Sequence, residues 1–171
     1  DVVRDLGAHV GTTLLTHGHA DHSAGAARFA ELSRSAVRAL DPAHRLGAEG
    51  VGDGDVLDAG GLGLRVVATP GHTSDSLSFL VPGDAAVLTG DTVLGRGTTV
   101  VAHPDGRLDA YLESLERLRR LATGGGITTV LPGHGPVLDD AQRAVEHYQA
   151  HREQRLDQVR RAVHEGATTP R

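Results

Sequence analysis

The densest group of potential metal ligands in the sequence lies at Thr16–His22, which spells Thr-His-Gly-His-Ala-Asp-His. Three imidazoles and one carboxylate fall within six residues, directly after the apolar stretch Thr13–Leu15. The small residues Gly18 and Ala20 separate the ligands, so the backbone can bend and direct several side chains to one point. Packing does not account for such a density, and the stretch predicts one half of a metal site.

Three later loops supply the other half. In each of them a short apolar segment, predicted to be a strand, is followed by a Gly-rich loop that carries a histidine or an aspartate. Functional side chains of α/β folds gather at strand ends and on the loops that follow them. We therefore expect seven side chains to converge on one site: His17, His19, Asp21, His22, His72, Asp91 and His134.

Five imidazoles and two carboxylates exceed the roughly four or five ligands of one zinc ion and suit a pair of ions. One carboxylate can bridge the pair, because each of its oxygens can bind a different metal. Two ions about 3.5–4 Å apart share a water and lower its pKa from about 15.7 to about 7. The predicted nucleophile is this bridging hydroxide, and the metals also polarise a carbonyl or phosphoryl oxygen. The predicted cofactor is two Zn²⁺, with Fe or Mn also compatible with nitrogen and oxygen ligands.

The remaining histidines are isolated in the sequence, and an isolated histidine is usually a surface residue or a satisfied core residue. A Gly-His-Thr or Gly-Asp-Thr triplet is likewise a weak signal by itself. The set is a strong signal because the triplets follow predicted strands and come in order behind the first cluster. We therefore assign no site role to His9, His44, His103, His147, His151 and His164.

The composition is typical of one globular domain. The chain has 171 residues, of which 39% are hydrophobic and 23% are charged, which is enough for a sizeable core. Because it lacks cysteine, it forms neither disulfides nor thiolate–metal bonds. The net charge is −5 and there is no long basic run, so the sequence does not favour a broad nucleic-acid-binding face.

The expected compartment is the cytoplasm. No apolar run approaches the ~18 residues of a membrane span, so no membrane partner is expected. The first residues also lack the basic and then apolar pattern of a signal peptide. The sequence indicates no particular oligomeric state.

Strand-like and helix-like apolar patterns alternate along the chain, which predicts an α/β fold (α+β by some schemes). The first helix places Phe29 and Leu32 mostly on one face. Asp21 or Ser23 is expected to cap it, which puts Asp21 and His22 near its positive end. The predicted strands are 12–15, 36–40, 56–57, 62–68, 77–81, 85–89 and 127–131, and the main predicted helices are 23–32, 108–122 and 139–164.

From about Thr12 to Gln154 the sequence resembles the metallo-β-lactamase superfamily. The His-x-His-x-Asp-His signature lies at Thr16–His22, and three shorter motifs follow at Pro70–Thr73, Thr89–Asp91 and Pro132–Pro136. The resemblance implies two ligand sets and a bridge. It assigns His17, His19 and His72 to the first metal, Asp21, His22 and His134 to the second, and Asp91 to both. It also implies a catalytic role for Asp21, which orients the nucleophilic water or shuttles its proton.

The resemblance implies a four-layer αββα sandwich made of two similar halves. That fold normally starts with several strands before the His motif, and this sequence has none there. We therefore expect residues 1–166 to be a partial domain, incomplete at the N-terminus, with one sheet short of partner strands. Residues 167–171 are expected to begin a missing C-terminal domain of winged-helix-like type, because threonine followed by Pro170 is a helix-start signal.

Two ligand positions narrow the subgroup. True β-lactamases of the commonest class have a cysteine at the position of Asp91 and no histidine at that of His22, so antibiotic hydrolysis is not expected. The two residues fit the glyoxalase II-like hydrolases and related RNA-processing nucleases. The loop Gly90–Val100, the motif Pro132–Pro136 and the pair His151–Arg152 are most similar to the lactamase-β-like endoribonuclease group.

The predicted activity is hydrolysis at a dinuclear metal centre, with a small ester, a thioester or a phosphodiester of single-stranded RNA as substrate. For RNA, Arg96, Thr98 and Thr99 could contact phosphate, although the same residues also fit a plain Gly-rich turn. With two Phe and two Tyr, the chain lacks the usual aromatic platform for stacking bases. The alternative function is a non-catalytic metal-binding or partner-binding scaffold with the same fold.

Overall fold

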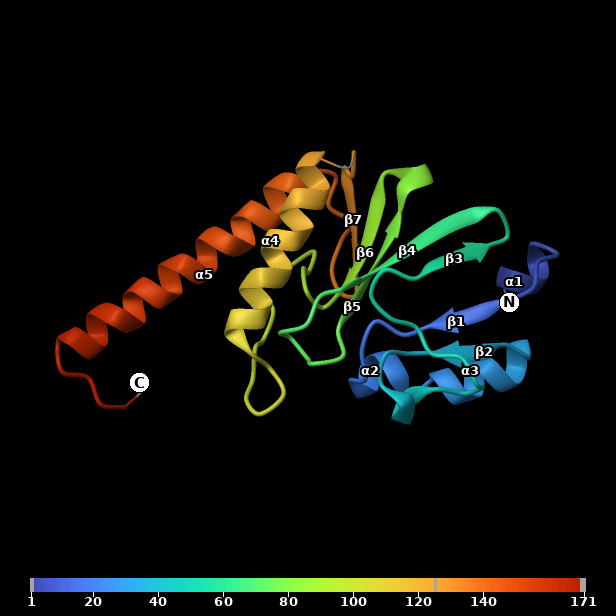
Figure 1. The fold of residues 1–171 in the computed structure, drawn as a ribbon, viewed down its shortest axis with the longest axis horizontal. Coiled ribbons are helices and arrows are strands. Elements are labelled where there is room, and N and C mark those ends of the chain that lie inside the picture. The colour runs from blue at the N-terminus through green and yellow to red at the C-terminus, as the bar shows by residue number, and fades with distance from the viewer. Residues whose placement is uncertain (1, 125, 170–171) are drawn as a thin grey trace.

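Two sheets lie face to face between two layers of helices in the computed structural model, which describes residues 2–124 and 126–169 (Figure 1). This arrangement is the predicted four-layer αββα sandwich. Pro170 and Arg171, on which the expected start of a further domain depends, lie outside the described residues. No helix among the described residues is both long enough and apolar enough to cross a membrane.

The larger sheet has the strand order β3-β4-β5-β6-β7. Strands β3 to β6 pair antiparallel with their sequence neighbours, which needs no crossover, and β7 pairs parallel with β6. A parallel pair needs a long crossover, and helix α4 (Leu108–Gly124) lies in that connection. The strand bounds are Val56–Ala59 for β3, Leu62–Ala68 for β4, Leu77–Val81 for β5, Ala86–Gly90 for β6 and Thr129–Pro132 for β7.

The smaller sheet pairs β1 (Thr12–Leu14) with β2 (Ala36–Arg38) in parallel. Its crossover contains the short helix α2 (Ala20–Ser23) and helix α3 (Ala26–Ser33). Before it lies the short helix α1 (Val2–Asp5). The ligand-rich stretch therefore lies in the crossover of a parallel pair, directly after β1.

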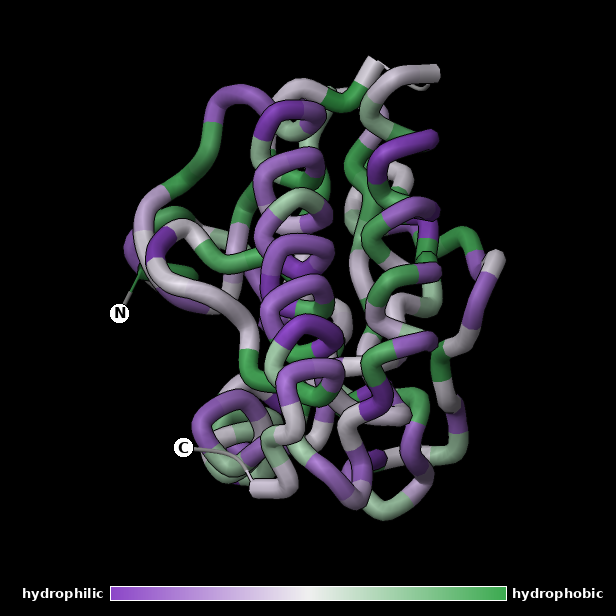
Figure 2. The backbone as a smooth tube through the Cα atoms, turned by 90° about the vertical axis from the view of Figure 1, so that its left-hand side faces the viewer, coloured by the Kyte–Doolittle hydropathy of each residue, from purple (hydrophilic) through white to green (hydrophobic). Residues whose placement is uncertain are grey.

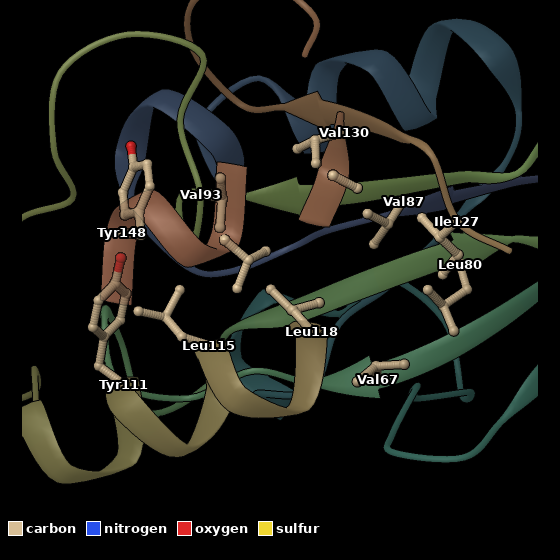
Figure 3. Close-up of a cluster of buried hydrophobic side chains, with 12 residues drawn as sticks. Val67, Leu80, Val87, Val93, Tyr111, Leu115, Leu118, Ile127, Val130 and Tyr148 are labelled. Atoms are coloured by element: carbon tan, nitrogen blue, oxygen red, sulfur yellow. The ribbon is translucent and has the colours of Figure 1, made fainter. Parts of the chain in front are cut away.

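Three apolar cores hold the four layers together. Alternating residues of the larger sheet serve two of them, since Val66 faces one core and Val67 the other. The largest core joins that sheet to α4 and α5 (Ala141–His164) and includes Leu115 and Tyr148 (Figure 3). The second core lies between the sheets, and the third packs α3 on the smaller sheet. Residue alternation within the strands thus fixes the order of the layers.

Helix α5 covers the sheet only with its first half. The side chain of Asp140 accepts a hydrogen bond from Arg143 N and begins the helix, and Val145 and Tyr148 are buried. The later part extends beyond the other elements, and Val159 and Val163 are exposed (Figure 1). Most helical turns that face the viewer in Figure 2 are hydrophilic, as expected for an outer layer.

The first predicted helix differs from expectation. It begins at Ala26 instead of Ser23, and Asp21 and His22 belong to the separate turn α2. Neither Asp21 nor Ser23 caps it: the N-cap is Gly25, without a side-chain hydrogen bond, and the Ser23 hydroxyl donates to Gly18 O instead. Phe29 and Leu32 are 45% and 67% exposed. Among the described residues the smaller sheet has two strands, so it covers a narrow stripe of α3 around Ala30.

The core under α4 predicts a sharp contrast between two leucines. Leu115 is fully buried in the largest core, so Leu115→Ala is expected to lower the free energy of unfolding by about 2–5 kcal/mol. Leu32→Ala is the matched control, because Leu32 is exposed, and its expected cost is within about 0.5 kcal/mol. Urea denaturation measures both values, and equal costs would contradict the arrangement of the layers.

Candidate metal centre

The direction of three strands brings three of the ligand loops to one edge of the larger sheet. Strands β4 and β6 run the same way because β5 lies antiparallel between them, and β7 is parallel to β6. His72, Asp91 and His134 each follow the carboxyl end of one of these strands. The loop after β1 joins this edge from the other sheet, because Leu77 N donates to Thr16 O at 2.7 Å. All four predicted loops therefore meet.

The first ligand set is formed by His17, His19 and His72, whose nearest nitrogens lie within 4.8 Å of one another. His19 Nδ1 is 3.1 Å from His17 Nε2 and 3.0 Å from His72 Nε2. Burial, with the neighbouring imidazoles of His22, His72 and His19, lowers the pKa of His17 to about 3. The His17 ring is therefore neutral at pH 7 and offers a lone pair.

The second set is formed by Asp21, His22 and His134. His134 Nε2 lies 3.1 Å from His22 Nε2 and 3.1 Å from an Asp21 carboxylate oxygen. Partial desolvation alone would raise the pKa of Asp21, but its own backbone N–H, His22 and His134 together hold it below its usual range. Asp21 is the most exposed member of the set, with 60% of its side chain accessible. It is ionised at neutral pH and can reach solvent.

Asp91 lies between the two sets. One of its oxygens, Oδ1, is 3.2 Å from His22 Nε2, and the other, Oδ2, is 3.7 Å from His72 Nε2 and 3.5 Å from His134 Nε2. Oδ1 is buried and accepts no hydrogen bond from the described residues. A buried carboxylate oxygen without a donor is costly unless a cation faces it. Asp91, surrounded by imidazole nitrogens from both sets, therefore fits a metal centre and the predicted bridging position.

Backbone and hydroxyl groups orient two of the imidazoles. His72 Nδ1 donates to Val100 O at 2.7 Å, which directs Nε2 toward the site. The Thr16 hydroxyl lies 3.1 Å from His17 Nδ1. The sequence reasoning missed Val100, because a backbone carbonyl supplies the contact and any residue type could provide it.

The segment 91–100, here called the Asp91 loop, is anchored from within. Thr99 is buried, and its hydroxyl donates to Asp91 O at 2.8 Å and to Thr92 O at 3.2 Å. The proposal that Thr99 contacts phosphate is therefore wrong, because its hydroxyl is used inside the protein. Arg96 is exposed and borders a separate cavity of about 480 Å³ beside the start of α5.

Comparisons with known proteins agree with this geometry. The sequence pattern of the family described as "Metallo-beta-lactamase superfamily" matches residues 3–134, which include all seven predicted ligands. The chain belongs to this superfamily. It is 36% identical to the atrochrysone carboxyl ACP thioesterase of Aspergillus fumigatus over 155 residues, which cover 88% of this chain and 46% of that protein. The chain spans about half the length of the curated relatives it matches.

Solved structures of the superfamily share the fold. A beta-lactamase domain protein from Burkholderia ambifaria superposes with a TM-score of 0.78 at 27% identity, over 94% of this chain and 61% of that one. A second structure, described as a di-iron-bound form, gives a TM-score of 0.67 at 27% identity, over 84% of this chain and 79% of that one. The αββα prediction made from the sequence is confirmed.

An open cavity of about 310 Å³ adjoins this metallo-β-lactamase centre at His19. His44, to which the sequence assigned no role, lies on its wall and packs on Gly18, where a β-carbon would be 2.3 Å from His44 Nε2. Three carboxylates also line the cavity: Asp41, Asp75 and Asp105. Because β2 and the turn Pro42–His44 bring residue 44 to the site only in the folded chain, the sequence held no signal for it. His9, His103, His147 and His164 are exposed, which agrees with the absence of a site role. The solvated-surface prediction is wrong for His151, which is half-buried and whose Nδ1 is buried without a hydrogen-bond partner among the described residues.

We predict that a side chain at position 133 weakens metal binding. A β-carbon at this position would lie 2.5 Å from Asp91 Oδ1 and 2.8 Å from His22 Cε1. Gly133→Ala should therefore displace both side chains and lower metal affinity at least about 10-fold, as expected when ligand orientation is lost. The matched control is Gly52→Ala, where a β-carbon meets no atom within 4 Å. Chelator competition measures the affinities, and an unchanged Gly133→Ala affinity would contradict the packing described.

Proposed function

We propose that this chain is a dinuclear metal-dependent hydrolase that cleaves small-molecule thioesters and is not a true β-lactamase. The single observation that carries the proposal is the convergence of two ligand sets with Asp91 between them. His17, His19 and His72 would hold one ion, Asp21, His22 and His134 the other, and Asp91 both. The iron pair of the solved relative supports two ions, and an all-nitrogen and oxygen ligand set suits Zn²⁺, Fe or Mn.

Two cations held in this way supply an activated water and an electrophile for the substrate carbonyl oxygen. Residues of the chain orient the ligands and the attacking water. The Val100 carbonyl and the Thr16 hydroxyl fix the ring orientations of His72 and His17. Asp21, ionised and with 60% of its side chain exposed, would orient the attacking water or shuttle its proton. Water oxygen joins the acyl carbon, the carbon–sulfur bond breaks, and the proton ends on the departing sulfur.

The choice of a thioester has two supports. The thioesterase that this chain resembles acts, by its name, on an acyl group carried by ACP. The carboxylates of Asp41, Asp75 and Asp105 surround the cavity beside His19, and their negative potential opposes a polyanion such as RNA. The endoribonuclease and glyoxalase II-like assignments stay predictions, and the cavity favours an uncharged acyl group.

Metal removal provides the central test. The intact protein is expected to bind about two metal ions per chain, and chelation should abolish thioester hydrolysis until Zn²⁺, Fe²⁺ or Mn²⁺ is restored. Asp91→Asn and His19→Ala should each reduce kcat/KM at least about 100-fold and lower the metal content. His164→Ala, on the exposed end of α5, is the control and should match the wild type.

Two results would contradict the proposal, each in a different way. Two bound ions with no turnover on an ester, thioester and RNA panel would support the non-catalytic scaffold instead. Unchanged metal content in Asp91→Asn and His19→Ala would show that the ligand assignment is wrong.

The charge of the cavity beside His19 should determine selectivity. Asp75→Asn removes one negative charge from its wall. A unit charge about 8 Å away in a water-rich site contributes about 0.5–1 kcal/mol. The ratio of kcat/KM for an anionic acyl thioester to that for a neutral one should therefore rise about two- to fivefold. Asp157→Asn, far along α5, is the control. An unchanged ratio in Asp75→Asn would exclude this cavity as the acyl site.

A further inference from the structure

Arg152 on α5 reaches the Asp91 loop at one point. Its guanidinium donates a hydrogen bond to Thr99 O, and its central carbon lies 4.9 Å from the centre of the Tyr111 ring. Among the described residues, no carboxylate lies within ion-pair distance of it. The charge of Arg152 is therefore directed at a backbone carbonyl and an aromatic face.

Thr99, the residue that Arg152 contacts, is connected to both ligand sets through hydrogen bonds of the Asp91 loop. The Thr99 hydroxyl donates to the backbone carbonyl of Asp91, the residue that lies between the two sets. The next carbonyl along the chain, that of Val100, accepts the hydrogen bond from His72 Nδ1. A shift of the Thr99 peptide would move both groups, so one contact from α5 acts on Asp91 and His72 together.

Arg152 is poorly explained as a stabilising residue. Its Nε is buried and has no hydrogen-bond partner within residues 2–124 and 126–169, which carries a desolvation cost. Two tyrosines already fasten the loop to the helices: Tyr111 donates to Thr92 O at 2.7 Å, and the Tyr148 hydroxyl bonds the backbone of Leu94 and Gly97. Their hydroxyls point the same way in Figure 3. Neither tyrosine reaches the far end of the loop, where Arg152 contacts Thr99 O and the Thr99 hydroxyl bonds back to the start of the loop.

We propose that Arg152 is a positioning residue of the metal centre, which holds the Thr99–Val100 peptide so that Asp91 and His72 face the metals. This inference rests on the proposed function only in requiring that the site binds metal. It does not depend on the substrate. Arg152 touches no ligand itself and acts through the Asp91 loop.

The test compares Arg152→Ala and Arg152→Lys with Arg155→Ala. Arg155 lies on the same helix, is exposed and bonds only Gln158 among the described residues, so it is the matched control. Zn²⁺ affinity is measured by chelator competition, and the ligand field by the visible absorption of the Co²⁺-loaded protein. Urea midpoints of the metal-free proteins report folding.

Arg152→Ala should weaken Zn²⁺ binding about 10- to 100-fold, the range for residues that orient metal ligands. Its Co²⁺ absorption band should shift, and millimolar guanidinium ion should restore part of the affinity by occupying the vacated space. Arg152→Lys should lie between Arg152→Ala and the wild type, because an ammonium keeps one donor but lacks the planar fork. Arg155→Ala should stay within twofold of the wild type.

An Arg152→Ala affinity within twofold of the wild type would overturn the inference, as would a loss that guanidinium does not reverse and that follows a lowered urea midpoint. If Arg152→Ala does not fold, the Co²⁺ spectrum and affinity of Arg152→Lys decide in the same way. A wild type that binds two ions but hydrolyses nothing removes the proposed function and leaves this inference in place. Thioester turnover by the wild type, together with an unchanged Zn²⁺ affinity of Arg152→Ala, would support the proposed function and overturn this inference.

Discussion

The direction of strands β4, β6 and β7 is the constraint on which the site depends. Because all three run the same way, the loops that follow them open at one edge of the larger sheet and carry His72, Asp91 and His134 to one place. The hydrogen bond between Leu77 N and Thr16 O brings the loop after β1 to the same edge. Without this topology, four loops that are distant in sequence would have no reason to meet.

The convergence of these imidazoles and carboxylates lowers the stability of the folded chain. Several imidazole nitrogens face one another at about 3 Å, and a buried carboxylate oxygen of Asp91 receives no hydrogen bond from the part of the chain that the structure describes. Such groups lose hydration without recovering it in hydrogen bonds. The three apolar cores and the close approach of Gly133 keep these groups in place. A protein that holds ligands in an otherwise unfavourable arrangement is ready for cations before they arrive, which is typical of a preorganised site.

The Asp91 loop connects the site to the outer helical layer. It supplies Asp91 at one end and the Val100 carbonyl at the other. Side chains of α4 and α5 donate hydrogen bonds to its backbone: Tyr111, Tyr148 and Arg152. Burial raises the pKa of Tyr111 to about 12, so its hydroxyl remains a donor at any physiological pH. The long helices α4 and α5 therefore shape the site, although none of their described residues belongs to the groups that could hold a metal. This explains why a helix with a largely hydrophilic surface has buried polar groups at Tyr148 and Arg152.

The sequence by itself determined which side chains converge and the class of fold. Clustered histidines and aspartates behind short apolar strands are a local signal, and alternation along β4 and leucine spacing along α4 are local as well. These signals were sufficient for the seven converging side chains and for the four layers. The tertiary structure alone decided which groups surround the ligands. Contacts between residues far apart in the chain bury Thr99, bring Arg152 to the Asp91 loop and place His44 beside Gly18. A backbone carbonyl such as that of Val100 carries no sequence signature. The exposure of Phe29 and Leu32 has the same origin, because helical periodicity indicates an apolar face, whereas the width of the opposing sheet determines how much of that face is buried.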